Sequence, residues 1–578
     1  MKRGILVLLA VLLPLQVLAG NVSPVRAGKV AANFFISRGL PDKLNSLSIP
    51  VKSEGDEPYY IFNNASANAF VIVSGDDATV PVLAYSFESV FSEPVPDNLA
   101  EWLDYVRDII CSLRREQVEP SAEVRVEWQA LEKPAVTKAV NAEGGKTLNT
   151  ALWGQGAPFN DLCPKVDGDK SVAGCVAVAT GIIMKYHEWP ETGNGRLPDY
   201  TYETKKGNTR TQEGHALGHE YDWKNMLMEY QTGRYSRKEA SAVSQLIYDI
   251  GVAMNMKYDS DGSSSLSAKI MEVLIKHFRY DENIKGLYLK YSTLENWIQT
   301  IKAEIDAGRP ICYSARTDDS GHAFVVDGYN SSSMLHINWG WSGNDNGFYA
   351  MPEFHVGKHN YKSNHYMVTG IRKYEGTSSS TGTLGYDDIS MNPSRIVPGI
   401  DFSITLTNIR EIGGAAYKGM VGLFLVDMDG TPKEMLGTEI PVSVSSGHYF
   451  PAKTIYLKMD KAPATGEAIM PYCRNTYNDE WKQMLCSSEG SGNDKVVPGK
   501  VDLVNGTSLT YHKENRIMTV NTLDDAEVIL LDKYGVKVDC TIRRDQNQTD
   551  IDLSPLKEGK YQIYVILGFA NLSIDIKK

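Results

Sequence analysis

The sequence predicts an α+β protein whose C-terminal third consists of β-strands. Up to about residue 375, some segments repeat apolar residues at helical spacing and others form short β-type runs. Beyond that point only short β-type runs remain, such as 421–426, separated by Gly and Pro, which is typical of a β-sandwich. The length of 578 residues corresponds to about four domains.

The composition limits the classes of protein that fit. Hydrophobic residues make up 42% and charged residues 22%, as in soluble globular proteins, which excludes a disordered, collagen-like or polytopic membrane protein. The net charge is −12 and no basic face is evident, so a nucleic-acid partner is not expected. Seven cysteines are too few for a disulfide scaffold.

The first 20 residues have the pattern of a secretory signal peptide. Lys2 and Arg3 precede the apolar run 5–18, and small residues follow at Ala19 and Gly20. The alternative is a membrane anchor, but the run is short for a span of about 20 residues. We therefore expect a soluble protein that is secreted or held at the cell surface.

Residues 21–146 are expected to form a small α+β domain. Residues 69–73 predict a strand, and Asp97 is placed as the N-cap of a following helix. The helix has one apolar face, made of Leu99, Trp102, Leu103, Val106, Ile109 and Ile110. The polar, Gly-containing stretch 138–146 is typical of an exposed linker that proteases cut.

Residues 147–375 alternate helices and strands. Ser236 with Glu239, and Ser292 with Glu295, form capping-box patterns ahead of two amphipathic helices. Strands are expected at 311–315, 323–327 and 334–338. A flexible linker follows at 375–383, then a β-sandwich at 385–490, a weak linker at 487–493 and a β-rich module at 500–578.

Cys175 is the first candidate for chemistry. Small residues precede it and an apolar, helix-compatible run follows, which places the cysteine at a helix N-terminus. The free N–H groups and the dipole of a helix N-terminus favour a thiolate, the nucleophilic form of cysteine. Taken alone, a buried structural cysteine is the commoner case.

His322 supplies the partner that such a thiol needs. It lies between Gly321 and an apolar strand, 322 − 175 = 147 residues after the cysteine, within the papain-type spacing of about 130–150 residues. An imidazole there can take the thiol proton and later protonate the leaving amine. Asn338 can hydrogen-bond the imidazole, while Trp339 and Trp341 shield it from water.

Gln155 lies upstream of the cysteine in the segment 153–160. Its side-chain amide can join the backbone N–H of Cys175 as a donor to an oxyanion. Without its neighbours this residue would be a weak candidate.

Four segments carry a family resemblance, and they occur in order: GQGAPFN (154–160), AGCVAVAT (173–180), GHAFVVDG (321–328) and NWGWSG (338–343). With FVIVSGDD (70–77) and PVLAYS (81–86), they resemble the streptopain family of papain-like cysteine proteases over roughly residues 60–372. The resemblance implies a papain-like catalytic domain at 147–375 that hydrolyses peptide bonds in protein and peptide substrates.

The resemblance also assigns roles. Cys175 is the nucleophile and His322 the general base, Asn338 and Trp339 orient the histidine, and Gln155 helps to form the oxyanion hole. The loop 258–266 corresponds to a substrate-groove loop of the family, and substrate contacts are expected at Gly174, Ser264, Gly321 and Trp341. The loop lacks the ligand pattern of an EF-hand, and neither a metal nor a cofactor is expected.

A zymogen is implied as well. Residues 21–146 would be a pro-domain that inhibits the active site from within the same chain, at high effective concentration, until the chain is cut between about 138 and 147 by sister molecules. The tail 527–578 is similar to the C-terminal sorting domains of the type IX secretion route, which implies contact with secretion machinery. The alternative for the tail is an ordinary β-module that binds a surface partner.

Two other classes of function compete with the secreted endopeptidase. One is a surface adhesin or binding protein that uses an inactive papain-like scaffold, although such a scaffold is expected to have lost Cys175 or His322. The other is a papain-like amidase or transglutaminase-type enzyme with the same Cys–His chemistry. Zinc-helix, nucleophile-elbow and phosphate-loop signatures are absent from the sequence.

Overall fold

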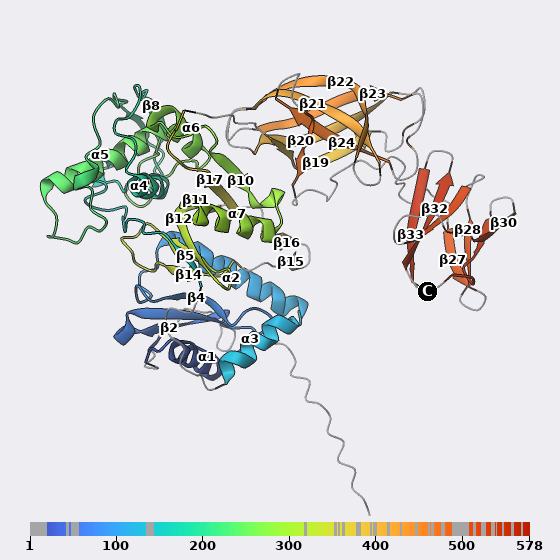
Figure 1. Ribbon diagram of the computed structural model, residues 1–578, viewed down its shortest axis with the longest axis horizontal. Coiled ribbons are helices and arrows are strands. Elements are labelled where there is room, and N and C mark those ends of the chain that lie inside the picture. The colour runs from blue at the N-terminus through green and yellow to red at the C-terminus, as the bar shows by residue number, and fades with distance from the viewer. Residues whose placement is uncertain are drawn as a thin grey trace, which may run out of the picture. The chain divides into compact units, whose positions relative to one another are not determined.

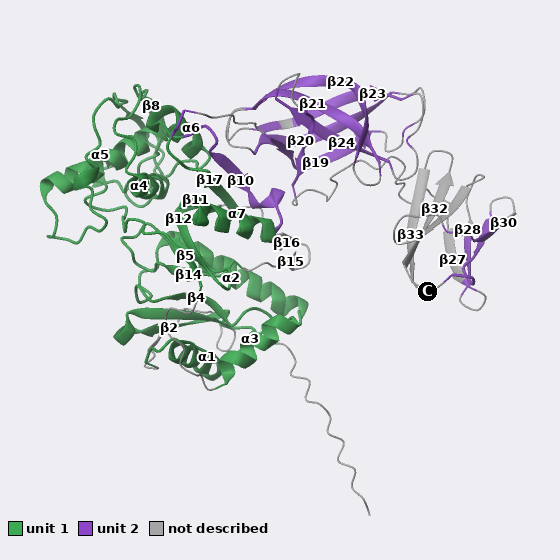
Figure 2. Cartoon of the chain, viewed as in Figure 1, with its two compact units in different colours: residues 1–280, 294–373 green, residues 281–293, 374–578 purple. Residues whose placement is uncertain are grey.

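The computed structural model divides the chain into two compact units (Figure 2). One consists of Met1–Tyr280 with Leu294–Lys373, the other of Asp281–Thr293 with Tyr374–Lys578. The structure describes residues 20–41, 45–47, 57–133, 144–316, 321–351, 355–356, 359–360, 365–376, 383–392, 396, 401–412, 417–427, 431–444, 449–459, 463, 467–475, 480–487, 508–512, 516–521, 527–532, 538, 540–545, 548–556, 560–567 and 570–577. The predicted signal peptide and the first and third predicted linkers lie mostly outside these residues, as does the centre of the second.

The N-terminal domain, residues 20–133, packs helices on a small antiparallel sheet. Its helices are α1 (Pro24–Ser37), α2 (Asp97–Glu116) and α3 (Ala122–Glu132), and its strands are β1 (Asn45–Leu47), β2 (Tyr59–Asn64), β3 (Ala69–Ser74) and β4 (Val82–Ser86). Helix α1 starts where the Ser23 side chain accepts a hydrogen bond from the Arg26 N–H, with Pro24 in the first turn. Helix α1 lies beside β2 (Figure 1). Its face with Val30 and Phe34 is buried in one apolar cluster with residues of the strands.

The sequence placed the main elements of this domain correctly. The strand predicted at 69–73 is β3, and the predicted apolar face belongs to α2, with Leu99, Leu103 and Val106 buried. The predicted N-cap is wrong by one residue: Pro96 is the N-cap and Asp97 is the first helical residue. The carboxylate of Asp97 still lies at the positive end of the helix.

The central domain, residues 144–280 and 294–373, combines helices with an antiparallel sheet. Ser236 and Glu239 form the predicted capping box at the start of α5. The predicted strands at 311–315, 323–327 and 334–338 are confirmed, the second being longer than expected. The helices are α4 (Cys175–His187), α5 (Arg237–Ala253), α6 (Lys269–Phe278) and α7 (Leu294–Asp306); the strands are β5 (Gly145–Thr147), β6 (Lys165–Val166), β7 (Asp169–Lys170), β8 (Tyr200–Glu203), β9 (Thr209–Gln212), β11 (Ile311–Arg316), β12 (Gly321–Asn330), β13 (Leu335–Asn338), β14 (Gly347–Tyr349), β15 (His355–Val356), β16 (His359–Asn360) and β17 (His365–Thr369).

One sheet runs through both domains. Its strands follow the order β1-β2-β3-β4-β14-β13-β12-β11-β17, so β4 of the N-terminal domain pairs with β14 of the central domain. Helix α4 packs against β12 and β11, and α2 of the N-terminal domain also contacts β12 (Figure 1). Strand β12 therefore contacts a helix of the central domain and a helix of the N-terminal domain.

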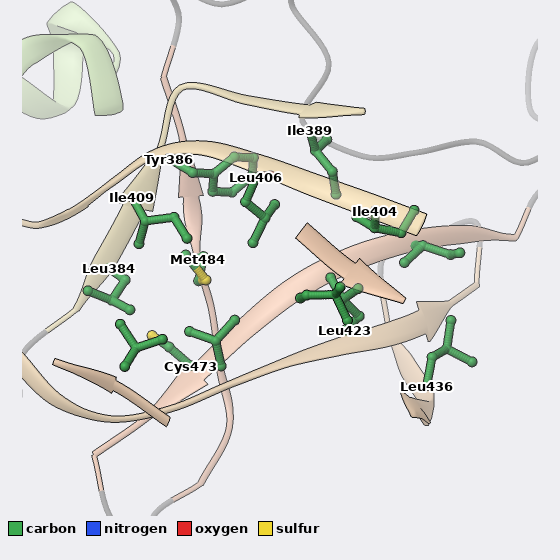
Figure 3. Packing of buried hydrophobic residues seen from close by; sticks show 14 of the residues in the cluster. Leu384, Tyr386, Ile389, Ile404, Leu406, Ile409, Leu423, Leu436, Cys473 and Met484 are labelled. Carbon is green, nitrogen blue, oxygen red and sulfur yellow. The ribbon is translucent and has the colours of Figure 1, made fainter. Parts of the chain in front are cut away.

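The second unit is built mainly of strands. β18 (Leu384–Tyr386), β19 (Asp388–Asn392), β20 (Asp401–Glu411), β23 (Tyr449–Lys458) and β26 (Leu485–Cys486) form one sheet, and β21 (Tyr417–Val426), β22 (Pro432–Val444), β24 (Ala468–Arg474) and β25 (Lys482–Gln483) form another. Leu406, Leu423 and Met484 lie in the apolar core that both sheets share (Figure 3). The unit also contains β10 (Lys285–Tyr288), β27 (Ser508–His512), β28 (Ile517–Asn521), β29 (Glu527–Asp532), β30 (Thr541–Asp545), β31 (Gln548–Asp552), β32 (Lys560–Leu567) and β33 (Ala570–Lys577).

Two further facts concern the described residues of both units. Cys111 is an exposed free thiol, and Cys163, Cys175, Cys312 and Cys473 are buried free thiols. Within the described ranges, none of the helices combines the length and the apolar character that a bilayer crossing requires.

Candidate active site

Cys175 is the first residue of α4, as the sequence predicts. Gly174 is the N-cap, with φ of 92°, a conformation that side chains rarely adopt. A Cβ there would also come within 2.8 Å of the Met256 sulfur and 3.2 Å of the Ser263 carbonyl oxygen. Glycine therefore lets the loop around Ser263 lie directly against the turn that presents the thiol.

The thiol of Cys175 lies beside the start of β12. Its Sγ accepts a hydrogen bond of 3.4 Å from the backbone N–H of Ala323, the residue that follows His322. The structure thus brings the two predicted residues into one region, although they are far apart in the sequence. The described contacts of the thiol include this backbone N–H and not the imidazole of His322.

His322 faces the N-terminal domain. Its Nε2 lies 3.8 Å from Oε1 of Glu101, which α2 carries. Directly across the sheet His322 pairs with Ala315 of β11. Adjacent residues of a strand point to opposite faces, so the His322 side chain is directed away from the face on which Ala323 lies.

Burial decides the charge state of both groups. Burial raises the pKa of the Cys175 thiol, although the N–H groups of Ala323, Val176 and Cys175 itself act in the opposite direction. Burial also lowers the pKa of His322, against the attraction of Asp97. Both pKa shifts favour the neutral thiol and the neutral imidazole near pH 7 over a thiolate–imidazolium pair.

Glu101 has a perturbed pKa at the same place. Partial burial, followed by repulsion from Asp97 and Asp104, raises the pKa of its carboxyl to about 7. Glu101 also acts on Cys175, because its charge contributes to the raised pKa of the thiol. One carboxyl of the N-terminal domain thus adjoins both predicted catalytic groups.

Asn338 does not orient His322 in this structure. The register of β12 and β13 pairs Asn338 with Val325, on the sheet face opposite to the His322 side chain. Its amide donates to Thr150 Oγ1 and to the Ala151 carbonyl oxygen, both at 3.0 Å, and its Oδ1 accepts from the Gly340 N–H. In this form Asn338 holds the first residues of the central domain against β13.

Trp339 lies on the same side of the sheet as His322. It is buried, and its ring packs on Phe324 at 4.8 Å and on Tyr349 at 5.0 Å between centroids. Phe324 is two residues after His322 and therefore shares its face. Trp339 supports that face, while no described contact joins it to the imidazole.

The N-terminal domain also covers Trp341. Asn98 of α2 donates to the Trp339 carbonyl oxygen at 2.8 Å and accepts from Trp341 Nε1 at 3.0 Å. Asn98 and Glu101 are one helical turn apart, so a single face of α2 occupies the site. The sequence predicts this helix, but it contains no signal that the helix crosses the site.

The remaining predicted residues lie around the thiol. Gln155 is buried. Its backbone carbonyl oxygen accepts a hydrogen bond from the N–H of Ala173, two residues before Cys175. Ser264 is exposed and forms an isolated antiparallel β-bridge with Lys257 through its backbone. The hydroxyl of its neighbour Ser263 donates to the Val172 carbonyl oxygen at 2.6 Å. Gly321 is the first residue of β12.

Among the described residues, no three His, Cys, Asp or Glu side chains are grouped so that they can hold a metal ion.

Family models match both domains. Residues 153–349 match the Peptidase C10 family, and residues 19–110 match the Spi protease inhibitor model. The Spi inhibitor match ends at residue 110, within α2, and the Peptidase C10 match begins at residue 153, directly before the GQGAPFN segment.

Known proteins are also similar to this chain. The Thiol protease/hemagglutinin PrtT of Porphyromonas gingivalis is 29% identical over 421 residues, which cover 71% of this chain and 47% of that protein. Streptopain of Streptococcus pyogenes is 28% identical over 328 residues, covering 54% of this chain and 77% of streptopain. The chain therefore spans about half the length of PrtT.

Two solved structures also match. A fragment of Prevotella intermedia prointerpain A has a TM-score of 0.45 and 25% sequence identity, covering 57% of this chain and 99% of the fragment. The active interpain A cysteine protease of the same organism has a TM-score of 0.35 and 30% identity, covering 39% of this chain and 94% of that protein.

Proposed function

Because residues 153–349 of this chain belong to the Peptidase C10 family, we propose that it is the secreted zymogen of a papain-like cysteine endopeptidase. Residues 21–146 are its inhibitory pro-domain and residues 147–375 its catalytic domain. One observation carries the proposal: a cysteine at a helix N-terminus adjoins the strand of His322, and a helix of the inhibitor-like domain covers both.

In the proposed reaction, Cys175 and His322 form a thiolate–imidazolium pair once α2 has left. The sulfur attacks the carbonyl carbon of the scissile bond, and the imidazolium protonates the leaving amine, which leaves a thioester. Water, deprotonated by His322, then hydrolyses the thioester and restores the thiol. Gln155 and the Cys175 N–H stabilise the oxyanion, while Trp339 supports the sheet face from which the histidine projects.

Activation removes a covalently attached inhibitor. While the chain is intact, the pro-domain has a high effective concentration at the site. A cut between residues 138 and 147, made by sister molecules, lets it dissociate. Water then reaches Cys175 and His322, which removes the burial that keeps both groups neutral.

Self-processing gives the direct test. Purified full-length protein under reducing conditions should shorten by about the pro-domain and then hydrolyse peptides. Cys175→Ala should stay full length, while Cys111→Ser, which changes an exposed thiol of the pro-domain, should mature normally. A Cys175→Ala protein that matures unaided would contradict the proposal.

The ends of the chain are proposed to direct export. Residues 1–20 act as a signal peptide that directs the chain across the inner membrane. Residues 500–578 act as a sorting domain that contacts type IX secretion machinery. Residues 385–490, which precede the sorting domain, form an Ig-like β-sandwich. Deletion of 500–578 should retain the protein in the periplasm of a host with that route, and secretion of the truncated protein would contradict this role.

A second candidate function concerns adhesion. PrtT carries the name hemagglutinin beside thiol protease, and its match extends over 71% of this chain. If the protein is an adhesin with an inactive scaffold, the wild type and the Cys175→Ala variant should agglutinate red cells equally well. Neither of them should cleave peptides. An acyl acceptor other than water would instead indicate an amidase or transglutaminase-type enzyme.

A further inference from the structure

Among the described strands, β4 of the pro-domain is the one that covers the outer edge of β14 in the catalytic domain. Strand β4 pairs with β14, with Tyr85 opposite Phe348 and Ala84 opposite Tyr349, and the Ala350 N–H donates to the Leu83 carbonyl oxygen at 2.8 Å. On its other side β14 pairs with β13. When the pro-domain leaves, β14 becomes an edge with unpaired backbone groups.

Backbone contact at this edge is unusually close. Gly347 begins β14, and a Cβ at this position would overlap the carbonyl oxygen of Tyr85. Glycine therefore admits a second strand against the backbone of β14. This feature belongs to the catalytic domain and remains after the pro-domain is removed.

Side chains of the catalytic domain contact particular side chains of β4 and of the residues that follow it. The ring of Tyr85 stacks on Phe348 at 5.2 Å, and its OH accepts from Asn330 Nδ2 at 2.9 Å. Three residues further on, the Glu88 carboxylate lies 3.1 Å from His336 Nε2. An aromatic residue followed three positions later by a carboxylate is thus recognised by stacking, a hydrogen bond and charge.

His336 lies between Asp327 of the catalytic domain and Glu88 of the pro-domain. Its Nδ1 lies 2.5 Å from Asp327 Oδ1, and Thr150 donates to the other oxygen of Asp327. Asp327 and Glu88 raise the pKa of His336 to about 10 against the effect of burial. Asp327 belongs to the catalytic domain, so one of the two carboxylates that raise the pKa of His336 stays in place when Glu88 has left.

Asp345 continues the row of polar groups. Its carboxylate accepts from the Ser92 N–H at 2.8 Å and from the Ser92 hydroxyl, while its own N–H donates to Ser89 Oγ at 3.0 Å. Met334 and Ala350 extend the apolar surface beside Phe348, in the same cluster as Phe34 and Tyr85 of the pro-domain. Loss of the pro-domain leaves all of these groups without their partners.

We propose that in the matured protease this edge is an exosite that binds an extended segment of a protein substrate by strand addition. The segment carries an aromatic residue on Phe348 and, three residues later, a carboxylate on His336. Strand addition supplies backbone hydrogen bonds, and the side-chain pair supplies specificity. The exosite rests on the proposed function, because it exists only after the pro-domain has been removed.

The binding test uses the full-length protein after processing has removed its pro-domain. The thiol of Cys175 is alkylated so that the protease does not cleave the probe. The probe is the fluorescent peptide VLAYSFESVFS, residues 82–92 of this chain, followed by fluorescence anisotropy. We expect saturable binding that weakens about tenfold or more when the peptide carries Glu88→Gln or Tyr85→Ala. Unprocessed protein, in which the edge is covered, should bind the peptide at least about tenfold more weakly.

A kinetic test separates the exosite from the active site. An unfolded protein substrate with this peptide as a tag should show a lower KM than the same substrate with a scrambled tag, at equal kcat. Hydrolysis of a short peptide substrate should not be inhibited by the free peptide. Every change lies in the ligand, so the fold of the enzyme is the same in all arms.

Three results would overturn the exosite: no binding of the peptide to processed protein, equal binding of the scrambled peptide, or inhibition of short-peptide hydrolysis, which places the peptide in the groove. Failure of the proposed function looks different. In that case the short peptide is not hydrolysed at all, while anisotropy still reports whether the edge binds.

Discussion

Oε1 of Glu101 lies 3.8 Å from Nε2 of His322, and the pair joins the two domains of the proposed zymogen. It is a weak ion pair, because the pKa of Glu101 is raised to about 7 and that of His322 is lowered, so both groups tend to be neutral when they meet. Glu101 therefore acts on His322 mainly by covering it from water and substrate, and only weakly by attracting its charge. Its strength must therefore change with pH.

The first prediction concerns Glu101→Gln. The raised pKa of Glu101 favours docking of the pro-domain at low pH, and this advantage is lost as pH rises from about 4.5 to 7. The lowered pKa of His322 acts oppositely, because docking is weakened as pH falls below 6.5. Glu101→Gln removes only the first effect, so the ratio of wild-type to variant dissociation constants should rise about tenfold from pH 5 to pH 8.

The measurement needs a pro-domain that is cut but not degraded. A Cys175→Ala protein with a site-specific protease sequence at residues 138–143 can be cut by the added protease, and dissociation then followed by calorimetry. Asp108→Asn changes an exposed carboxylate of the same helix and is the matched control. A ratio that stays constant over this pH range would refute a role for Glu101 in pH-dependent docking.

The second prediction concerns Asn98→Ala. The change leaves the Trp339 carbonyl oxygen and Trp341 Nε1 without their partner in the docked state. Each buried polar group without a partner costs about 1–3 kcal/mol, so the pro-domain should bind at least about tenfold more weakly. Full-length Asn98→Ala should therefore mature faster on a gel time course. Arg115→Ala, an exposed change in the last turn of the same helix, should mature at the wild-type rate.

Local signals account for the elements that the sequence placed correctly. The capping box of Ser236 and Glu239 and the strand beginning at Ile311 are set by neighbouring residues. The N-cap at Pro96 was missed because the sequence rule favours a polar side chain, whereas here the cap makes no side-chain hydrogen bond. Such errors shift a boundary without changing the fold.

The site could be predicted only in part, and the division has a physical cause. Cys175 and His322 are marked by their own flanking residues, so the sequence indicates them. The role of Asn338 depends on strand register, since pairing with Val325 places it on the face away from the His322 side chain. Glu101 and Asn98 act through the packing of one domain on another, for which a single sequence carries no pattern.

The third prediction separates two roles of Asn338. In the precursor its amide binds Thr150 and Ala151, so Asn338→Ala should lower the free energy of unfolding by about 1–3 kcal/mol and the melting temperature of the precursor by about 2–6 °C. If it also orients His322 after activation, kcat of the matured enzyme should fall while KM changes little. Unchanged melting together with a loss of kcat would show that the contacts seen here are unimportant for stability.

The fourth prediction concerns the reactivity of Cys175 before and after processing. Burial raises the pKa of the thiol in the precursor, so the thiolate fraction at pH 6–7 is small and alkylation by iodoacetamide should be slow, rising only at alkaline pH. After removal of the pro-domain the same N–H groups of the α4 N-terminus act without the burial. The rate at pH 6 should then increase by at least about 100-fold, because each unit of pKa changes the thiolate fraction about tenfold.

The comparison is clean in a Cys111→Ser background, which removes the exposed thiol of the pro-domain, with the modified residue identified by mass spectrometry. Cys163 is an internal control, since burial raises its pKa to about 12 and it belongs to the catalytic domain in both forms. Its rate should not follow that of Cys175. If Cys175 reacted equally fast in precursor and matured protein, the pro-domain would not control the thiol, and inhibition would have to act on His322 alone.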